Sequence, residues 1–399
     1  MFKRITAKLK TLILSLCMLS TNISYADEAP DPWQLNMFQG VTPISKDIYN
    51  LHMTAMWVCA AIGAVVFGVM IYSLIRHRKS RGYKPASFHD NTRLEIIWSV
   101  IPFLILVGLA IPATRILINL EDNNEADVTI KIVGYQWKWE YQYLDEGVQY
   151  FSNLATPFEQ IQNKAPKNQW YLLEVDKPLV LPVNKKVRFL VTSNDVVHSW
   201  WVPELGVKRD AIPGFMHEAW ARIEKTGIYR GQCAELCGVN HAFMPIEVHA
   251  VSESQYRTWL KDQSQKPLTS TDASAPTLSH TSLMEEGQKK YELLCSACHQ
   301  ADGTGIPPLY PALKGSSVAV GHPIDRHIDI ILNGIPNTAM QPYRTQLTDE
   351  EIAAIITYER NAWGNNTNEQ VQPRDVASVR KNYEQSATVV KKAKAGGLQ

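Results

Sequence analysis

The chain has 399 residues, 45% of them apolar, and its 40 Lys and Arg almost balance its 39 Asp and Glu. A chain of this length accommodates two or three domains. The near-zero net charge does not indicate a nucleic-acid partner, and none is predicted.

The first 26 residues have the pattern of a secretory signal peptide. Basic residues between Lys3 and Lys10 precede an apolar core from Thr11 to Leu19, which is too short to cross a bilayer. Ser24 and Ala26 give the small-x-small ending of a cleavage site, so Asp27 is the expected first residue of the mature chain. The alternative is an uncleaved anchor.

Residues 27–120 are expected to form an N-terminal segment and a transmembrane helical hairpin. Two apolar stretches, at about 53–75 and 96–118, are each long enough to cross a hydrocarbon core of ~30 Å. The loop between them, Arg76 to Lys84, is densely basic, whereas the outer flanks are acidic. The positive-inside rule therefore places the loop in the cytoplasm. The rest of the chain then lies on the periplasmic side of a bacterial inner membrane, and the chain crosses it twice.

Residues 121–262 are predicted to form a β-sandwich. Polar and apolar residues alternate in short runs, such as Asp127 to Val133, and turn signals separate the runs. Short strands at this spacing are typical of two packed antiparallel sheets.

The C-terminal part has three predicted sections. Residues 263–282 are rich in Ser, Thr, Ala and Pro and are interpreted as a linker. Residues 283–364 are predicted to be helical, with Thr348 capping the last helix. The polar tail, 365–399, is expected to be disordered.

One loop in the β-rich region carries a set of soft-metal ligands. Cys233, Cys237, His241 and Met244 are spaced C-x3-C-x3-H-x2-M. Thiolate, imidazole and thioether together are the ligands of copper electron-transfer sites. A single copper needs one cysteine, so two cysteines predict a pair of copper ions bridged by both sulfurs. Sharing one electron over two metals keeps the change in geometry small when that electron arrives or leaves.

A second histidine is needed, one for each copper, and His198 is the candidate. It follows the strand-like segment Val187 to Thr192, and cupredoxin-like sandwiches bring a histidine from such a strand end to the ligand loop. Zinc is the alternative metal, but zinc sites use C-x2-C pairs or His-rich sets and rarely recruit methionine. The pattern therefore favours copper.

A second motif, Cys295-Ser296-Ala297-Cys298-His299, is the C-x-x-C-H attachment site of c-type haem. The cysteines form thioethers with the haem and the histidine ligates the iron. Met340 is the sole methionine downstream of the motif, so it is the expected ligand on the other face of the haem. A thioredoxin-like C-x-x-C is the alternative, and the adjoining histidine and the lack of a βαβ pattern argue against it.

These motifs resemble cytochrome c oxidase subunit II of the bacterial caa type, which has a fused C-terminal cytochrome c domain. The resemblance runs from the hairpin to the haem helices and includes the stretches Gly134 to Trp139 and Asp210 to Gly214. It implies a multi-domain fold with three parts: a transmembrane α-helical hairpin, an all-β cupredoxin-like sandwich and an all-α cytochrome c domain.

The resemblance also implies cofactors. Its dinuclear copper centre, CuA, takes its ligands from His198, Cys233, Glu235, Cys237, His241 and Met244, with Glu235 contributing its backbone carbonyl. Its haem c is attached to Cys295 and Cys298 and ligated by His299 and Met340. The Glu235 carboxylate is also expected to reach a magnesium ion at the border with subunit I, since a hard cation prefers oxygen ligands.

Two further residues gain roles through the resemblance. Trp137 matches the tryptophan through which electrons enter the copper centre, although it could instead be a sandwich aromatic. Glu95, at the cytoplasmic edge of the second span, matches the entrance of a proton path into subunit I. The alternative for Glu95 is a helix-start charge that favours the positive end of the helix dipole.

The implied function is electron transfer within cytochrome c oxidase, a proton-translocating oxidoreductase. The chain would accept electrons from cytochrome c, from a bc-type complex or from its own haem c, and pass them through CuA to subunit I. There O2 is reduced to water while protons are pumped. The expected partners are subunits I and III, the electron donor and the membrane. The alternative is a stand-alone, membrane-anchored copper and haem electron carrier.

Overall fold

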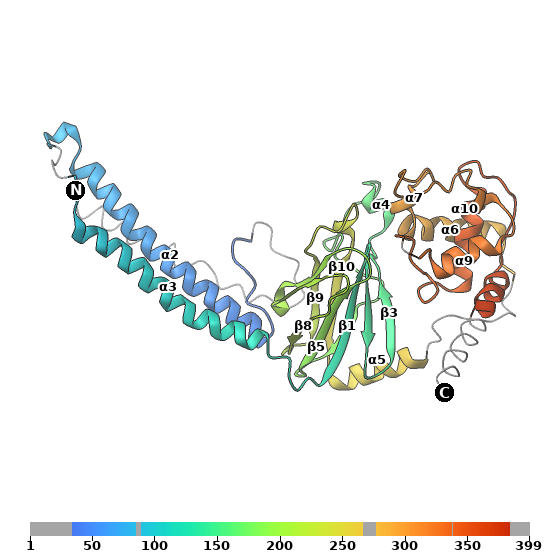
Figure 1. Cartoon of the computed structure of the whole chain (residues 1–399), viewed down its shortest axis with the longest axis horizontal. Helices are drawn as coiled ribbons and strands as arrows, with labels where there is room; N and C mark the ends of the chain where they lie inside the picture. The colour runs from blue at the N-terminus through green and yellow to red at the C-terminus, as the bar shows by residue number, and fades with distance from the viewer. Residues whose placement is uncertain (1–33, 85–88, 266–276, 337, 384–399) are drawn as a thin grey trace, which may run out of the picture.

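The computed structural model describes residues 34–84, 89–265, 277–336 and 338–383. Over these residues the chain forms a helical hairpin, a sandwich of two β-sheets and a helical domain, in that order (Figure 1). The sandwich lies between the other two units. The predicted fold class is therefore confirmed, whereas the expected signal peptide lies outside the described residues.

The hairpin consists of α2 (Pro43–Arg76) and α3 (Thr92–Leu120), and the connecting loop contains the short helix η1 (Lys79–Arg81). Both long helices are apolar and long enough to cross a membrane. Their large apolar side chains are mostly exposed, as expected for surfaces that face lipid. The two predicted spans are thus found within longer helices.

The first long helix begins at Pro43, well before the apolar stretch that starts near residue 53. Thr42 caps it in a capping box with Ser45, which satisfies free N–H groups of the first turn. Ile44 and Ser45 are buried, so this first turn packs on protein and not on lipid. The sequence pattern predicted only the apolar part of the helix because the first turns are polar.

Both ends of the hairpin are hydrogen-bonded to the sandwich. At the start of α2, the Thr42 hydroxyl donates to the backbone carbonyl of Leu205 at 2.8 Å. At the end of α3, the Trp220 indole donates to the backbone carbonyl of Asn119 at 2.9 Å. These contacts fix the orientation of the sandwich relative to the two helices.

The sandwich contains two five-stranded sheets, with strand orders β3-β2-β1-β5-β8 and β4-β10-β9-β6-β7. The strands are β1 (Val128–Tyr135), β2 (Lys138–Tyr143), β3 (Val148–Ser152), β4 (Leu179–Pro182), β5 (Val187–Ser193), β6 (His198–Val202), β7 (Val207–Ala211), β8 (His217–Ala221), β9 (Gly227–Cys233) and β10 (Pro245–Val251). Strand β1 pairs with β5 in parallel, as β4 does with β10, and the remaining neighbours are antiparallel. Two short helices, α4 (Phe158–Ile161) and η2 (Pro203–Leu205), lie in the connections.

The core of the sandwich is rich in aromatic residues. Trp139 and Tyr141 of β2 alternate with more polar neighbours and are completely buried, as are Phe189 of β5 in the same sheet and Trp200 of β6 in the opposite sheet. Large aromatic rings fill the space between two sheets with few side chains. Helix α5 (Glu253–Gln265) closes one end of this core, where its Trp259 ring packs on Tyr143.

The helical domain consists of α6 (His280–Leu294), α7 (Ser296–His299), α8 (Ser317–Val320), α9 (Asp325–Asn333) and α10 (Asp349–Asn361). Helices α6 and α10 cross closely at Gly287. A Cβ atom at Gly287 would lie 2.1 Å from the Ala354 carbonyl oxygen, so only glycine allows this approach. The predicted Thr348 cap is confirmed and forms a capping box with Glu351.

Two predicted boundaries of the C-terminal part are wrong. Helix α6 begins at His280, inside the predicted linker. The tail that was expected to be disordered from residue 365 is helical at 373–383. Val376 is completely buried in the core of the helical domain, and the guanidinium of Arg380 donates to Asp349 at 2.7 Å. A tail with polar composition is therefore part of the domain, because a few side chains anchor it.

Candidate metal centre and haem cavity

The C-x3-C-x3-H-x2-M motif forms the loop that joins two antiparallel neighbours, β9 and β10. Strand β9 ends at Cys233, and β10 begins directly after Met244. His198 starts β6, which pairs with β9 so that Trp200 lies opposite Cys233. This strand register brings a histidine that is distant in sequence next to the first cysteine.

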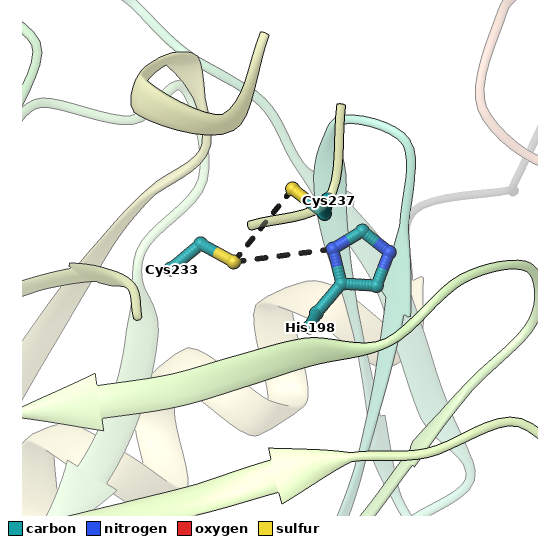
Figure 2. Close-up of side chains that lie close together, drawn as sticks. All are labelled: His198, Cys233 and Cys237. Carbon is teal, nitrogen blue, oxygen red and sulfur yellow. Dashed lines mark hydrogen bonds between the residues drawn. The ribbon is translucent and has the colours of Figure 1, made fainter. Parts of the chain in front are cut away.

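His198, Cys233 and Cys237 form one buried cluster whose ligand atoms all lie within 4.8 Å of one another. Figure 2 shows the His198 imidazole directed at the Cys233 sulfur, with the Cys237 sulfur above and between these two groups. The distance is 3.9 Å from Cys233 Sγ both to His198 Nδ1 and to Cys237 Sγ. A disulfide needs a sulfur separation of ~2.05 Å, so both sulfurs are free to act as ligands.

The remaining donors of the loop lie on the flanks of this cluster. His241 Nδ1 and Met244 Sδ are each 3.5 Å from Cys237 Sγ. The backbone carbonyl oxygen of Glu235 is 3.3 Å from Cys233 Sγ. Every residue predicted for the copper centre is therefore at one place, and each sulfur has an imidazole beside it. Such a mixed set of thiolate, imidazole and thioether suits soft transition metals.

The two thiols influence each other's protonation. A hydrogen bond from Cys237 lowers the pKa of Cys233 to about 4, with a further contribution from His198 and against the effect of burial. The hydrogen bond with Cys233, together with burial, raises the pKa of Cys237. The sulfurs thus share a proton, which a bound metal would displace because metals bind the thiolate.

Asp195 orients His198 and was not predicted in that role. Its Oδ1 atom lies 2.8 Å from His198 Nε2, so the Nε2–H group donates to the carboxylate and Nδ1 faces the cysteines with its lone pair. Burial acts to lower the pKa of His198, but hydrogen bonds with Asp195 and Cys233 outweigh it and leave the pKa raised. The sequence places Asp195 close to His198, but no pattern distinguishes it from other loop carboxylates.

Trp137 packs directly against the metal-binding loop. Its indole Nε1–H donates to the Cys237 backbone carbonyl at 3.3 Å, and the Gln136 amide donates to the same oxygen at 2.8 Å. A Cβ atom at Gly238 would lie 3.0 Å from the Trp137 ring, so the absence of a side chain there allows the close contact. Trp137 is therefore not an ordinary core aromatic, in contrast to the completely buried Trp139.

A cavity of about 970 Å³ lies in the helical domain and extends to the Trp137 turn of the sandwich. Cys295, Cys298, His299 and Met340 all line it, and so does Trp137. The cavity thus brings the predicted haem ligands together from the motif and from a segment far along the chain. Asn240 and Phe243 of the metal-binding loop also line the cavity, so this loop and Trp137 together form that part of its wall.

The orientation of His299 fits a haem ligand. Its Nδ1 atom lies 2.9 Å from the Pro311 carbonyl oxygen, which can only accept a hydrogen bond, so Nδ1 carries the proton. The Nε2 lone pair is then free for iron, in the usual arrangement of a ligating histidine held by a backbone carbonyl. Pro311 was missed by sequence reasoning, because a backbone acceptor leaves no signal in side-chain spacing.

Residues on both sides of the cavity mouth connect the sandwich to the helical domain. The Gln341 amide donates to the Gln136 backbone carbonyl at 3.0 Å. Lys138, which is only 3% exposed, bonds the Gln346 side chain and places its ammonium group 4.3 Å from the centre of the Tyr343 ring. Burial lowers the pKa of Lys138 to about 7, although nearby carboxylates favour its charged form.

Glu95 lies apart from both sites. It is an exposed residue of the first turn of α3, at the end of the hairpin distant from the sandwich (Figure 1). The helix between Glu95 and Leu120 spans ~38 Å at 1.5 Å per residue. The Glu235 side chain is also exposed, although its carbonyl faces Cys233.

Comparison with known proteins identifies the family. Residues 128–251 match the periplasmic domain of cytochrome c oxidase subunit II, and residues 30–116 match its transmembrane domain. Residues 282–358 match subunit III of the cbb3-type cytochrome c oxidase. The chain is 40% identical to a probable cytochrome c oxidase subunit 2 of Rickettsia bellii over 248 residues. These residues are 62% of this chain and 90% of the relative. The chain belongs to the cytochrome c oxidase subunit II family.

Other members of the subunit II family show the same similarity. Cytochrome c oxidase subunit 2 of Cereibacter sphaeroides is 38% identical over 245 residues, which are 58% of this chain and 81% of that protein. The crystal structure of the periplasmic domain of subunit II of the Bradyrhizobium japonicum oxidase is 43% identical, with a TM-score of 0.31. It covers 35% of this chain and 96% of that chain.

The family matches agree with the division of the fold. The hairpin and the sandwich make up a membrane-anchored subunit II with a periplasmic domain. The helical domain is a fused cytochrome c domain. CuA-type copper and haem c are the cofactors that these domains support, and other subunits of a haem–copper oxidase are the partners.

Proposed function

We propose that this chain receives electrons on haem c and delivers them through a dinuclear copper centre to subunit I of cytochrome c oxidase. The donor is cytochrome c or a bc-type complex, and the chain sits in a bacterial inner membrane with its copper and haem domains in the periplasm. The observation that carries the proposal is the position of Trp137, which contacts the copper loop and also lines the haem cavity.

The copper centre is assigned to the following residues: His198, Cys233, Glu235 through its carbonyl, Cys237, His241 and Met244. Two cysteines, each with its own imidazole neighbour, support a pair of metals more than a single one. The buried cysteines and the Asp195 hydrogen bond hold the donors in place before a metal binds. When bound, the copper pair and haem c each accept and release one electron.

Haem c is assigned to Cys295 and Cys298 as covalent attachment points and to His299 and Met340 as axial ligands. Support comes from the shared cavity and from the Nδ1 hydrogen bond that leaves His299 Nε2 available. Part of the cavity wall is buried, because Tyr343, Ile331 and Ile355 lie there. A buried, apolar surrounding and a methionine ligand both favour a high reduction potential.

Trp137 is assigned as the residue through which electrons reach the copper loop. Its ring packs on Gly238, and its Nε1–H group bonds the carbonyl of the ligand residue Cys237. The same ring belongs to the wall of the haem cavity. Trp137 thus contacts both cofactor positions, with the Cys237 backbone carbonyl as its partner on the copper side.

The surface around the copper loop is suited to a partner subunit. Leu236 and Val239 of the loop are 79% and 66% exposed, and the nearby loop residue Phe215 is 64% exposed. Exposed apolar patches of this kind commonly mark protein interfaces. The exposed Glu235 carboxylate lies on the same loop, so we assign it to a magnesium ion shared with subunit I. Subunit III is the further partner of this assembly.

Glu95 is assigned to the entrance of a proton path. The carboxylate is exposed in the first turn of α3 and lies at the cytoplasmic edge if the sandwich is periplasmic. Ionisable groups at a membrane edge are suitable proton acceptors. Its position, ~38 Å of helix from the sandwich, separates a proton role from electron transfer.

The copper assignment is tested by Cys233→Ser in the complete oxidase complex, with Cys59→Ser as the matched control. Cys59 is an exposed cysteine of the transmembrane helix α2 and lies outside the proposed sites. We expect Cys233→Ser to reduce copper binding at this centre by more than ~100-fold, a larger loss than is usual for residues that only orient a metal ligand. Turnover should be abolished while haem c remains attached, and the control should keep copper, haem and turnover.

Metal analysis, the mixed-valence electron paramagnetic resonance signal and haem content measured as the pyridine complex decide this test. Retained turnover with normal copper in Cys233→Ser would contradict the assignment. Zinc in the wild-type centre, or a single copper without electron delocalisation, would contradict it as well.

A further inference from the structure

A buried histidine and a buried glutamate face each other in the wall of the haem cavity. His327 belongs to α9 and Glu359 to α10, and both residues line the cavity. Each is only 3% exposed, and His327 Nε2 lies 2.7 Å from Glu359 Oε2. Neither residue belongs to the proposed set of haem ligands, and an ordinary cytochrome core would be more stable with apolar side chains at both positions.

The other ring nitrogen of His327 has no hydrogen-bond partner among the described residues, and it is buried. A buried polar nitrogen without a partner costs about 1–3 kcal/mol. Because His327 lines the cavity, a group in that cavity is the available partner for Nδ1. The unpartnered nitrogen therefore indicates that the pair is built to interact with the cavity's occupant.

The pair has two protonation states that differ by one charge. With a neutral His327 and an ionised Glu359, the Nε2–H group donates to the carboxylate and the net charge is −1. One added proton makes the pair neutral, either as imidazolium with carboxylate or as imidazole with carboxylic acid. A nearby positive charge favours the anionic pair, and removal of that charge favours the neutral pair that has bound a proton.

The tyrosines around Glu359 stay uncharged near neutral pH, whereas the basic side chains nearby have their own partners. Burial is the main reason that the pKa values of Tyr291, Tyr343 and Tyr358 are raised, and Glu359 itself adds to each shift. Cys295, which also feels Glu359, would be an uncharged thioether after haem attachment. Arg360, next to Glu359 in sequence, is engaged by Glu369 and backbone carbonyls, and Lys290 on the cavity wall is paired with Glu351. Lys289 and Lys138 also line the cavity, and burial lowers the pKa of Lys138 to about 7.

We propose that His327 and Glu359 form a proton-binding site coupled to the haem, so that the chain takes up a proton when haem c is reduced. This inference rests on the proposed function, because it requires haem c in the cavity. One electron comes from the donor and one proton comes from the solvent. The proton binds to the pair and returns to the solvent when the electron leaves the haem.

The coupling follows from charge. A ferric haem core carries one more positive charge than a ferrous core, so reduction removes a charge that favours the anionic state of the pair. The proton affinity of the pair then rises. The measurable consequence is a midpoint potential of haem c that falls as pH rises wherever the reduced protein binds this proton and the oxidised protein does not.

The test is a spectroelectrochemical titration of haem c in the full-length holoprotein between pH 5 and pH 9. For the wild type we expect a potential that falls over part of this range, by up to ~59 mV for each tenfold drop in proton activity. Glu359→Gln and His327→Gln should each flatten this dependence. His322→Gln is the matched control, because His322 also pairs with a glutamate, Glu369, but is 68% exposed. The control should keep the wild-type slope.

Each outcome decides the inference. A wild-type potential that does not change with pH would overturn it even if neither variant folds, and so would a slope that survives in both variants. Haem content and melting temperature, measured in the same samples, show whether a variant still holds haem. If the wild type carries no covalent haem, the proposed function fails together with the inference. If haem is attached but the potential is independent of pH, only the inference fails.

Discussion

The copper loop and the haem cavity place their ligands in different ways. The loop supplies nearly all donors from residues 233–244, held between two hydrogen-bonded strands, and it needs only His198 from elsewhere. The cavity takes its wall from α6, α9, α10 and the Trp137 turn of another domain. A short loop keeps its geometry when distant parts of the chain change, whereas the cavity depends on long-range packing. This contrast predicts which substitutions disturb both centres and which disturb only one.

Trp137, which contacts the copper loop and lines the haem cavity, should show the largest effect on electron transfer. We expect Trp137→Phe to lower the rate of electron exchange between haem c and copper by about 10- to 100-fold, because exact positioning of the connecting ring is lost. Phenylalanine lacks the Nε1–H group that bonds Cys237. Copper and haem contents should remain normal.

Flash-induced electron transfer in the full chain measures this rate. Trp259→Phe is the control, since Trp259 packs at the α5 end of the sandwich and should leave the rate unchanged. An unchanged rate in Trp137→Phe would show that electrons reach the copper loop by another route.

The second prediction separates the two regions through stability. Arg380→Met removes the guanidinium that pairs with the buried Asp349, which should cost ~3–5 kcal/mol in the unfolding free energy of the haem domain. The melting transition of the haem domain should fall, and the copper domain should unfold as before. Differential scanning calorimetry measures both transitions.

Arg374→Met, at an exposed residue of the same C-terminal segment, is the control and should have little effect. Equal destabilisation of the copper domain by Arg380→Met would argue against independent stability of the two regions.

The third prediction concerns the contact between the two regions and has the smallest effect. The pKa of Lys138 is about 7 when the domains are in contact, compared with its ordinary value of 10.5. The docked state therefore binds fewer protons between these pH values, and docking should strengthen as pH rises from about 7 to 10.5. The linkage is at most about tenfold in the docking constant per pH unit. Below pH 7 both states are protonated, and the dependence should vanish.

Distances between spin labels on the two domains report the docked fraction. Lys138→Met should make docking independent of pH across this range, whereas Lys185→Met, at an exposed pair with Asp127, should not. Docking that weakens with rising pH in the wild type would contradict the buried, neutral Lys138.

The same contrast explains how much the sequence predicts. The copper loop and the C-x-x-C-H motif are readable because their donors lie within a few residues of each other. His198 required the strand register, and Trp137 required the resemblance to a family. His327, Glu359 and Lys138 could not be recognised, since each acquires its role from a partner on a different element. The sequence also did not predict that the C-terminal tail packs on the helical domain. Val376 and Arg380 lie in a polar segment, and their partners are far upstream in the chain.

The hydrogen bonds from Thr42 to Leu205 and from Trp220 to Asn119 have a mechanical consequence. They make the sandwich a rigid extension of two rods that stand in the lipid, so the copper loop is kept at a constant height above the bilayer. Since tunnelling between redox centres is sharply sensitive to their separation, thermal tilting of the domain does not vary the gap to an acceptor buried in the membrane.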